Sequence, residues 1–198
     1  ALAIRRRFHD RDHPDLAQSL NNLGNLLYRR GRLGEAAALF NEALALWRRL
    51  LGPDHPDVIV GMTNLAQVER QRGDLAAAQA IIEGAVALQR ERLAEDDLTV
   101  VRSMNLLGEI LIERRSVVEG VEILRRVLAV REEKLGLENW RTAMTACALA
   151  EGLERLGDVD EARRLFRISA DVLQKENHAD MTRPMKGLER VGKKQVAR

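Results

Sequence analysis

A period of 42 residues is the feature of this sequence that most limits its fold. The tripeptide His13-Pro14-Asp15 returns as His55-Pro56-Asp57, and residues 13–54 and 55–96 are identical at 16 of 42 positions without a gap. The same register continues through 97–138 and 139–180. A unit of this size cannot bury its apolar surface alone, so repeated units stack on one another. We therefore expect one solenoid over residues 1–180.

Each repeat reads as two helices joined by a tight turn. In the first repeat, Leu16, Leu20, Leu23 and Leu27 share one helical face, and Ala36, Phe40, Ala43 and Trp47 share another. Pro14 and Asp15 fit a helix start, and Gly31 fits a left-handed helix end. We predict positive φ at Gly31, Gly73 and Gly157. Arg115 replaces this glycine in the third repeat, which either strains a left-handed position or changes the turn.

Small residues recur at fixed points of each unit. Gly24, Ala66, Gly108 and Ala150 lie in the first helices, and Ala36, Ala78, Gly120 and Ala162 lie in the second helices. A small side chain lets two helices approach closely, while larger neighbours fill the space between them. The pattern therefore predicts close contact within each helix pair.

The 42-residue register also predicts what the two ends of the chain are. Residues 1–12 match the end of a preceding repeat, so we expect the first eight residues to be helical and the chain to be a fragment of a larger protein. Residues 181–198 are either a degenerate first helix of a fifth repeat or a basic tail. An unfinished repeat exposes apolar surface, which predicts weak end-to-end self-association.

Composition supports a soluble, all-α, cytoplasmic protein. The chain of 198 residues is 45% hydrophobic, 31% charged and 3% aromatic, with a net charge of +2 and one cysteine. It has no apolar run long enough for a membrane span. The balanced charge and the scarcity of stacking aromatics argue against nucleic acid as a partner.

At this level of detail the repeats resemble tetratricopeptide repeats. The residues that carry the resemblance are Leu20, Leu23-Gly24 and Leu27, followed by Ala36, Phe40 and Ala43. The 42-residue period and the Leu-Gly-Pro-Asp-His-Pro-Asp loop of residues 51–57 are similar to the long repeats of kinesin light chains. The resemblance implies a right-handed superhelical solenoid of stacked antiparallel helix pairs. It also implies a non-catalytic module that binds a peptide or helix of a partner protein in a concave groove. The alternative is a regulatory or sensor arm of a multidomain signalling ATPase, kinase or transcription factor.

In that family the first helix of each pair lines the groove. The corresponding polar positions, which we predict to form the peptide-binding groove, are Gln18, Asn21, Asn25, Tyr28, Arg29, Thr63, Gln67, Arg70, Arg102, Asn105, Glu109 and Glu113. A carboxamide can donate and accept, so it can bond a ligand's main chain whatever the ligand's side chains are. Asn22 and Asn64 are candidates either for the groove or for bonds between helices. The groove should be basic in the first two repeats and more acidic in the next two, with Glu109, Glu113, Glu151 and Glu154.

No residue pattern indicates catalysis, a metal or a cofactor. His13 and His55 are interpreted as loop or cap residues, and Cys147 as a small groove-side residue rather than a reactive thiol. Arg48, Arg49, Arg90, Arg131 and Lys134 alternate with acids and read as a solvated outer face. Some tetratricopeptide domains bind the C-terminal carboxylate of chaperones with a clamp of three cations and two asparagines. Asn25 and Asn64 match the asparagines of that clamp, but two of its three cations are missing from this sequence.

Overall fold

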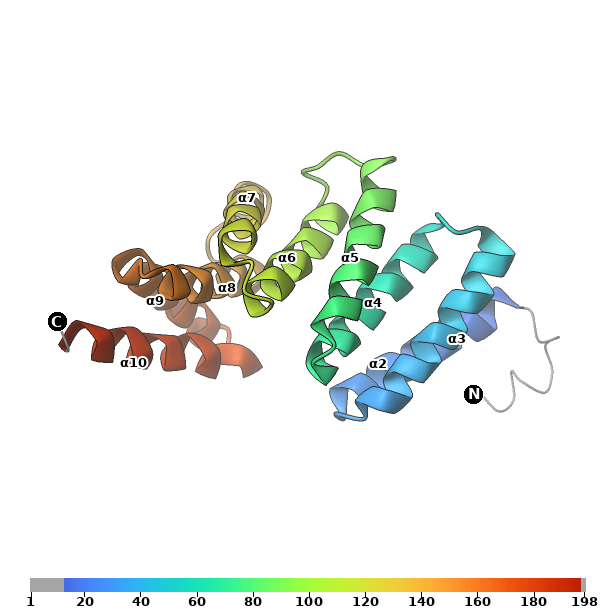
Figure 1. Ribbon diagram of the computed structural model, residues 1–198, viewed down its shortest axis with the longest axis horizontal. Coiled ribbons are helices and arrows are strands. Elements are labelled where there is room, and N and C mark those ends of the chain that lie inside the picture. The colour runs from blue at the N-terminus through green and yellow to red at the C-terminus, as the bar shows by residue number, and fades with distance from the viewer. Residues whose placement is uncertain (1–12, 197–198) are drawn as a thin grey trace. The chain divides into compact units, whose positions relative to one another are not determined.

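The structure, a computed structural model, describes residues 13–196, and the side chains of residues 13–193. These residues form nine α-helices and the short 3-10 helix η1 (Ala179–Met181), with no strand among them (Figure 1). The helices are α2 (Pro14–Arg29), α3 (Leu33–Leu51), α4 (Pro56–Arg72), α5 (Leu75–Arg90), α6 (Leu98–Glu113), α7 (Val117–Leu135), α8 (Trp140–Leu156), α9 (Val159–Lys175) and α10 (Thr182–Val196). The helix expected at residues 1–8 lies outside the described residues. None of the described helices is long and apolar enough to cross a bilayer.

The chain divides into two compact units, residues 1–93 and 94–198. In the first unit α2 pairs with α3, α4 pairs with α5, and α3 packs on α4. In the second unit α6 pairs with α7 and α8 with α9, while α7 packs on α8 and α10 packs on α9 and α8. The fold is thus a stack of sequential antiparallel helix pairs, as predicted, with one pair in each 42-residue repeat. The continuity of a single solenoid through residue 180 stays a prediction.

Each first helix begins at a side chain that caps the backbone N–H two residues further on. The Nδ1 atom of His13 accepts from the N–H of Asp15 at 3.2 Å, and His55 does the same for Asp57. The interpretation of both histidines as cap residues is confirmed, whereas Asp15 lies in the first turn rather than at the cap. Three further residues repeat this geometry: Asp97 and Asn139 in the repeats that lack His-Pro-Asp, and His178 at η1. Asp97 and Asn139 were not recognised as caps because their residue types differ from histidine, and His178 was not recognised because it lies outside the 42-residue register.

The turns inside the helix pairs have the predicted left-handed geometry. The φ angles of Gly31, Gly73 and Gly157 are 73°, 87° and 88°. Arg115 keeps the same turn with a φ of 71°, so the third repeat holds a residue with a Cβ atom in a conformation that glycine adopts without strain. The backbone N–H of Arg115 still donates to the carbonyl of Ile112, as the glycines do in their repeats.

Small residues let the paired helices touch, as predicted. A Cβ atom on Gly120 of α7 would lie 2.7 Å from the carbonyl oxygen of Gly108 on α6. In the first unit a Cβ on Gly24 would lie 2.9 Å from the ring of Phe40. Gly120 thus faces backbone and Gly24 faces an aromatic ring. Neither glycine can be replaced by a residue with a Cβ atom unless its neighbour moves.

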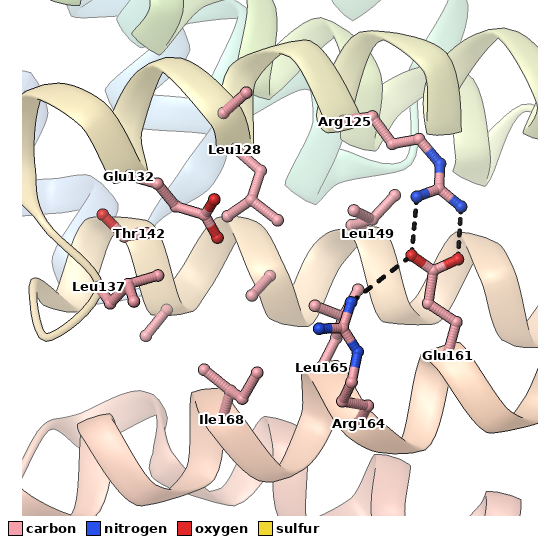
Figure 2. A pocket seen from close by; sticks show the side chains of 13 residues that line it. Arg125, Leu128, Glu132, Leu137, Thr142, Leu149, Glu161, Arg164, Leu165 and Ile168 are labelled. Atoms are coloured by element: carbon pink, nitrogen blue, oxygen red, sulfur yellow. Dashed lines mark hydrogen bonds and ion pairs between the residues drawn. The ribbon is translucent and has the colours of Figure 1, made fainter.

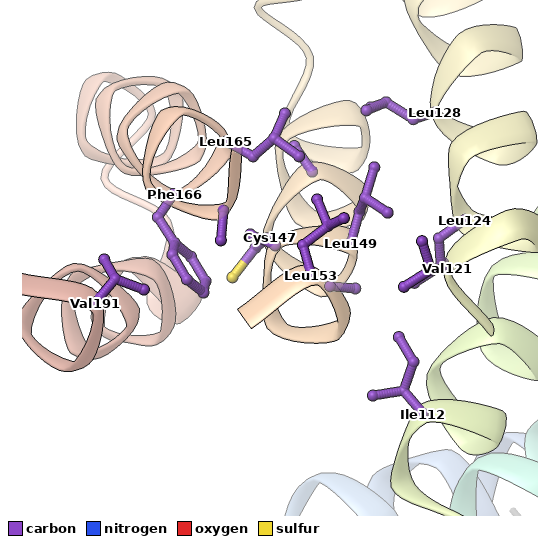
Figure 3. Close-up of a cluster of buried hydrophobic side chains, with 14 residues drawn as sticks. Ile112, Val121, Leu124, Leu128, Cys147, Leu149, Leu153, Leu165, Phe166 and Val191 are labelled. Atoms are coloured by element: carbon purple, nitrogen blue, oxygen red, sulfur yellow. The ribbon is translucent and has the colours of Figure 1, made fainter. Parts of the chain in front are cut away.

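In the second unit α8 is buried between α7 and α9. Arg125 of α7 and Glu161 of α9 form a two-pronged ion pair at 2.7 and 2.5 Å (Figure 2). Leu149, Leu153 and Phe166 belong to the cluster of buried side chains that α7, α8, α9 and α10 share (Figure 3). Burying apolar side chains of this size stabilises a fold by roughly 1.5 to 3 kcal/mol each. These contacts hold together the helices that carry the polar network of the second unit.

Candidate functional site

In the first unit one polar surface runs along α2 and α4. We call it the α2–α4 face; it consists of Gln18, Asn22, Asn25 and Arg29 on α2 and Val60, Asn64, Gln67 and Gln71 on α4, all exposed or half-buried. On each helix these positions are spaced by four, three and four residues, which places them on one side of the helix. Seven of the eight side chains are polar and none is a carboxylate. Four of its members, Gln18, Asn25, Arg29 and Gln67, were predicted to form the groove, and Asn22 and Asn64 were candidates either for the groove or for bonds between helices.

Hydrogen bonds across this face join α4 to α2. Asn64 donates its Nδ2 proton to Oδ1 of Asn21 at 3.0 Å. Gln67 and Gln71 both donate to the hydroxyl oxygen of Tyr28, at 3.1 and 2.7 Å. Asn64 therefore bonds between helices, which was one of the two roles considered for it. Tyr28 accepts hydrogen bonds from two further carboxamides of α4.

Two of the predicted groove residues lie below this surface. Asn21 is 4% exposed and is the acceptor for Asn64. Thr63 is 6% exposed and donates its hydroxyl proton to the carbonyl of Ile59, one turn back in its own helix. A ligand on the α2–α4 face would meet Asn25, Gln67 and Gln71 before either of these side chains.

The α2–α4 face is positively charged at one end, where the last turns of α2 and α4 lie. Arg29 is in the last turn of α2 and is exposed, and Arg70 is half-buried in the last turn of α4. This end of the face therefore suits a negatively charged group.

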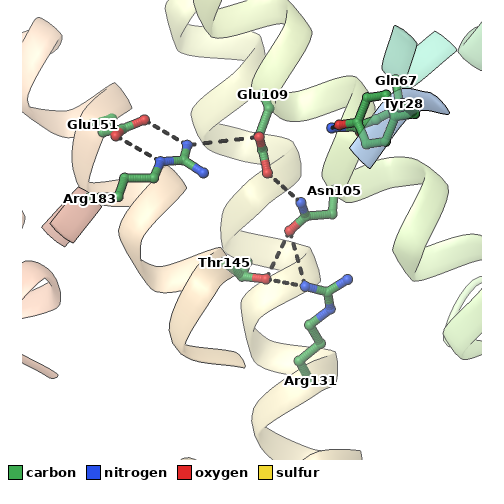
Figure 4. A network of polar contacts seen from close by, with 8 residues as sticks. All are labelled: Tyr28, Gln67, Asn105, Glu109, Arg131, Thr145, Glu151 and Arg183. Carbon is green, nitrogen blue, oxygen red and sulfur yellow. Dashed lines mark hydrogen bonds and ion pairs between the residues drawn. The ribbon is translucent and has the colours of Figure 1, made fainter. Parts of the chain in front are cut away.

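In the second unit the corresponding carboxamide is already engaged. Asn105 of α6 accepts at Oδ1 from Thr145 at 2.8 Å and from Arg131 at 3.3 Å, and donates at Nδ2 to Glu109 at 2.7 Å (Figure 4). Both ends of its carboxamide thus have partners inside the unit. Asn105, predicted to bond a ligand, connects α6 to α7 and α8.

The assignment of Arg131 to a solvated outer face is wrong. Its side chain is buried, with 7% exposed, and it donates to Thr145, to Asn105 and to the carbonyl of Arg141. Removal from water lowers the pKa of its guanidinium to about 10, and the charge of Glu109 opposes that shift. The repeat register contained the signal, because its equivalents Trp47, Gln89 and Leu173 are also buried.

The predicted acidic groove of the third and fourth repeats is largely neutralised by α10. Arg183 binds Glu151 at 2.8 and 3.0 Å and lies 3.8 Å from Glu109 (Figure 4). Arg190 binds Glu154, whose side chain is 9% exposed, at 2.9 Å. These pairs were not predicted, because residues 181–198 could be either a degenerate helix or a basic tail.

The remaining predicted residues of this unit are dispersed around that network. Arg102 is exposed on α6, and Glu113 is half-buried in its last turn. Arg155 of α8 donates to the carbonyl of Ile112, near the end of α6, at 2.6 Å. Both arginines are exposed, but Arg155, which was not among the predicted groove residues, already bonds α6.

The described residues hold no arrangement suited to catalysis by a thiol or a metal. Cys147 is fully buried in the core of the second unit, and this burial raises the pKa of its thiol to about 12. The reactive thiolate is therefore scarce at neutral pH. Among the residues that the structure describes, no three His, Cys, Asp or Glu side chains gather as a metal site would require.

Known structures share this arrangement of helices. A putative kinesin light chain from Podosopora anserina with nearly identical tetratricopeptide-like repeats has a TM-score of 0.71 and 23% identity, over 89% of this chain and 83% of that one. BtubC from P. vanneervenii has a TM-score of 0.75 and 22% identity, over 91% and 73% of the two chains. The apo form of RapI has a TM-score of 0.74 and 16% identity, over 91% of this chain and 64% of that one. At these identities the matches show the fold alone.

No curated protein matches the sequence. The sequence profiles of the tetratricopeptide repeat, in contrast, match residues 16–57, 59–97, 100–140 and 143–167. These ranges cover most of the chain and follow the helix pairs of the structure. The chain therefore belongs to the tetratricopeptide repeat family, whose domains are generally protein-interaction modules.

Proposed function

We propose that this domain binds a peptide or helix of a partner protein, without catalysis, and that the α2–α4 face is the binding surface of its first unit. The observation that carries the proposal is the composition of this face. It presents side-chain amides on two adjacent helices, with a cationic end and without a carboxylate.

Carboxamides suit the main chain of a protein ligand. An extended peptide presents N–H and C=O groups in alternation, and each exposed amide can bond either kind. Asn25, Gln67 and Gln71 offer three such groups on neighbouring turns, and Tyr28 holds two of them in place. We infer that the ligand's backbone lies along these three side chains and that an acidic side chain or C-terminal carboxylate lies near Arg29.

In the second unit the predicted contacts are weaker candidates for ligand binding. Asn105 and Glu109 would have to give up bonds inside the unit before they bonded a ligand. Arg102, which is exposed, remains a candidate there. We therefore place the main binding energy on the first unit and assign the network around Asn105 to the stability of the second.

The test begins with affinity capture of partners, followed by titration of an identified partner peptide. The variant combines Asn25→Ala, Gln67→Ala and Gln71→Ala. Each neutral hydrogen bond is worth about 0.5 to 1.5 kcal/mol, so the loss of three should lower the affinity roughly 10- to 2,000-fold. The matched control is Arg48→Ala with Arg90→Ala on α3 and α5, which should leave the affinity unchanged.

Circular dichroism of each variant shows whether the helices are intact. Unchanged affinity of the triple variant with wild-type helicity would move the binding surface elsewhere and refute this assignment. The regulatory-arm alternative and the origin of the chain as a fragment concern the parent protein, and both stay predictions.

A further inference from the structure

A groove runs along α8 in the second unit, between α7 and α9. Both flanking helices pack on α8, and the ion pair of Arg125 with Glu161 links them to each other. The groove has a volume of about 360 Å³ and is open to solvent. This volume lies at the lower end of the range of ligand sites.

Two alanines create the space in this groove. Ala143 and Ala146 line it from α8, and Leu128, Leu165 and Ile168 line it from the flanking helices (Figure 2). Two repeats earlier, in the first unit, the equivalents of the alanines are Ile59 and Met62, which are both buried.

There, the methyl group of Met62 lies 3.2 Å from the position that a Cβ on Gly84 would take. Gly84 is itself the equivalent of Ile168. The larger side chain thus fills the corresponding place in the first unit, while the second unit leaves it empty. The groove is a property of particular residues and not of the repeat in general.

The two ends of the groove carry opposite charges. At one end Arg125 is paired with Glu161, and Arg164, whose side chain is 66% exposed, lies 3.9 Å from the same carboxylate. Asp158 also acts on the charge of Arg125, so the ion pairs at this end are balanced, and the exposed guanidinium of Arg164 presents a cation to a ligand. At the other end Glu132 is exposed beside Leu137, which is 59% exposed (Figure 2). Arg125 and Glu132 are seven residues apart on α7, about two helical turns or 10 Å.

The lining has little capacity to bond a ligand's main chain. Thr142, the hydroxyl residue of the groove, donates its proton to the carbonyl of Arg131 at 3.4 Å. An extended segment would therefore lose main-chain hydrogen bonds to water without replacement, which is costly. A helix satisfies its own main chain and presents only side chains.

We propose that this groove binds an amphipathic helix of a partner protein, with one or two leucine-like side chains over Ala143 and Ala146, an acidic residue toward Arg164 and a basic residue toward Glu132. The two charged residues of that helix are spaced by seven, and the apolar residues lie three and four positions after the first of them. This surface is separate from the α2–α4 face, and its occupant is recognised by side chains rather than by its backbone.

The test uses fluorescein-labelled helical peptides of about 18 residues, a length at which an isolated helix can form. The first peptide has Glu, Leu, Leu and Lys at positions i, i+3, i+4 and i+7. Exchanging Glu and Lys is no control, because the helix can turn end for end. The control peptide has Glu at both charged positions.

Fluorescence polarisation should show saturable binding of the mixed-charge peptide below about 1 mM, with the diacidic peptide about two- to fivefold weaker, as is typical of one exposed ion pair. Ala146→Met, which installs the residue found at the equivalent place in the first unit, should weaken binding at least tenfold. Glu132→Arg, which makes both ends positive, should reverse the preference in favour of the diacidic peptide.

Leu137→Ser provides a second variant outside the packed core, in case Ala146→Met perturbs folding; it should weaken binding several-fold with wild-type helicity. The triple variant of the α2–α4 face should bind the helical peptide as the wild type does, which separates the two sites. No saturation by about 1 mM, or equal binding by wild type, Ala146→Met and Leu137→Ser, would overturn the proposal. So would light scattering that shows self-association blocked by Ala146→Met, since a second copy would then be the occupant.

Discussion

Replacing Arg115 by glycine should stabilise this protein. Arg115 has a φ of 71°, in the left-handed region where the turns of the other repeats use Gly31, Gly73 and Gly157. Its backbone N–H bonds the carbonyl of Ile112, so the turn keeps its hydrogen bond with any residue at this position. The substitution therefore changes the conformational cost of the turn and little else.

The magnitude follows from two opposing terms. A side chain in the left-handed region costs roughly 1 to 2 kcal/mol, which glycine removes. Glycine also makes the unfolded chain more flexible, which costs about 0.4 to 1 kcal/mol. The net gain is about 0.5 to 1 kcal/mol, and for a chain of this length it should raise Tm by roughly 1 to 4 °C.

Chemical and thermal denaturation of three variants would test this reasoning. Arg115→Ala removes the side chain but keeps the strain, so it should show no comparable gain. Gly73→Arg makes the reverse change at the equivalent turn and should lose a similar free energy of unfolding. If Arg115→Gly were destabilised, or if Arg115→Ala gained as much as Arg115→Gly, left-handed strain would not be the cause.

Three further changes test the packing, the buried network and the caps. Gly120→Ala should destabilise the second unit by about 1 to 3 kcal/mol in urea denaturation, because its Cβ would lie 2.7 Å from the carbonyl oxygen of Gly108. Gly192→Ala is the control, since a Cβ there meets nothing within 4 Å, and a loss as large as that of Gly120→Ala would contradict the explanation. Arg131→Met should cost about 1 to 3 kcal/mol by leaving buried acceptors without their donor, and a neutral effect would show that the network is dispensable. The N–H two residues after Asp97 lowers the pKa of that carboxyl. The stabilisation by this cap should therefore be complete above the unfolded pKa near 4 and be lost as pH falls through the lower folded pKa. Asp97→Ala should cost about 1 kcal/mol at pH 7 but little at pH 2, and a difference from wild type that is independent of pH would refute this linkage.

The repeat made much of the fold predictable because each position is constrained several times over. Phe40 and its equivalents Ile82, Leu124 and Phe166 share one packing environment, so four copies of the pattern indicate one helix face. The turn glycines were predictable for the same reason. The caps of the third and fourth repeats were not, because a histidine can be replaced by any side chain with a suitably placed acceptor, such as Asp97.

The candidate site was predictable in outline only. The surface positions of α2 and α4 follow from the register, and Asn25, Gln67 and Arg29 are accessible as expected. Asn21 and Asn105 were also expected to face a ligand, but each bonds another helix. Whether an amide faces solvent or a neighbouring helix depends on the distance between its own helix and the next one. That distance is set by the packing of the side chains between the two helices.

The sequence by itself determined the helix pairs, their boundaries and the turns between them, because these depend on local preferences and on a period that repeats. Tertiary structure alone decided which charges remain available to a partner. Arg183 and Arg190 neutralise carboxylates more than 30 residues away. Ala143 and Ala146 open a groove only because α7 and α9 stand apart on α8. Both outcomes depend on contacts between residues distant in the chain, and a period of 42 residues places such residues near one another without specifying which of their atoms meet.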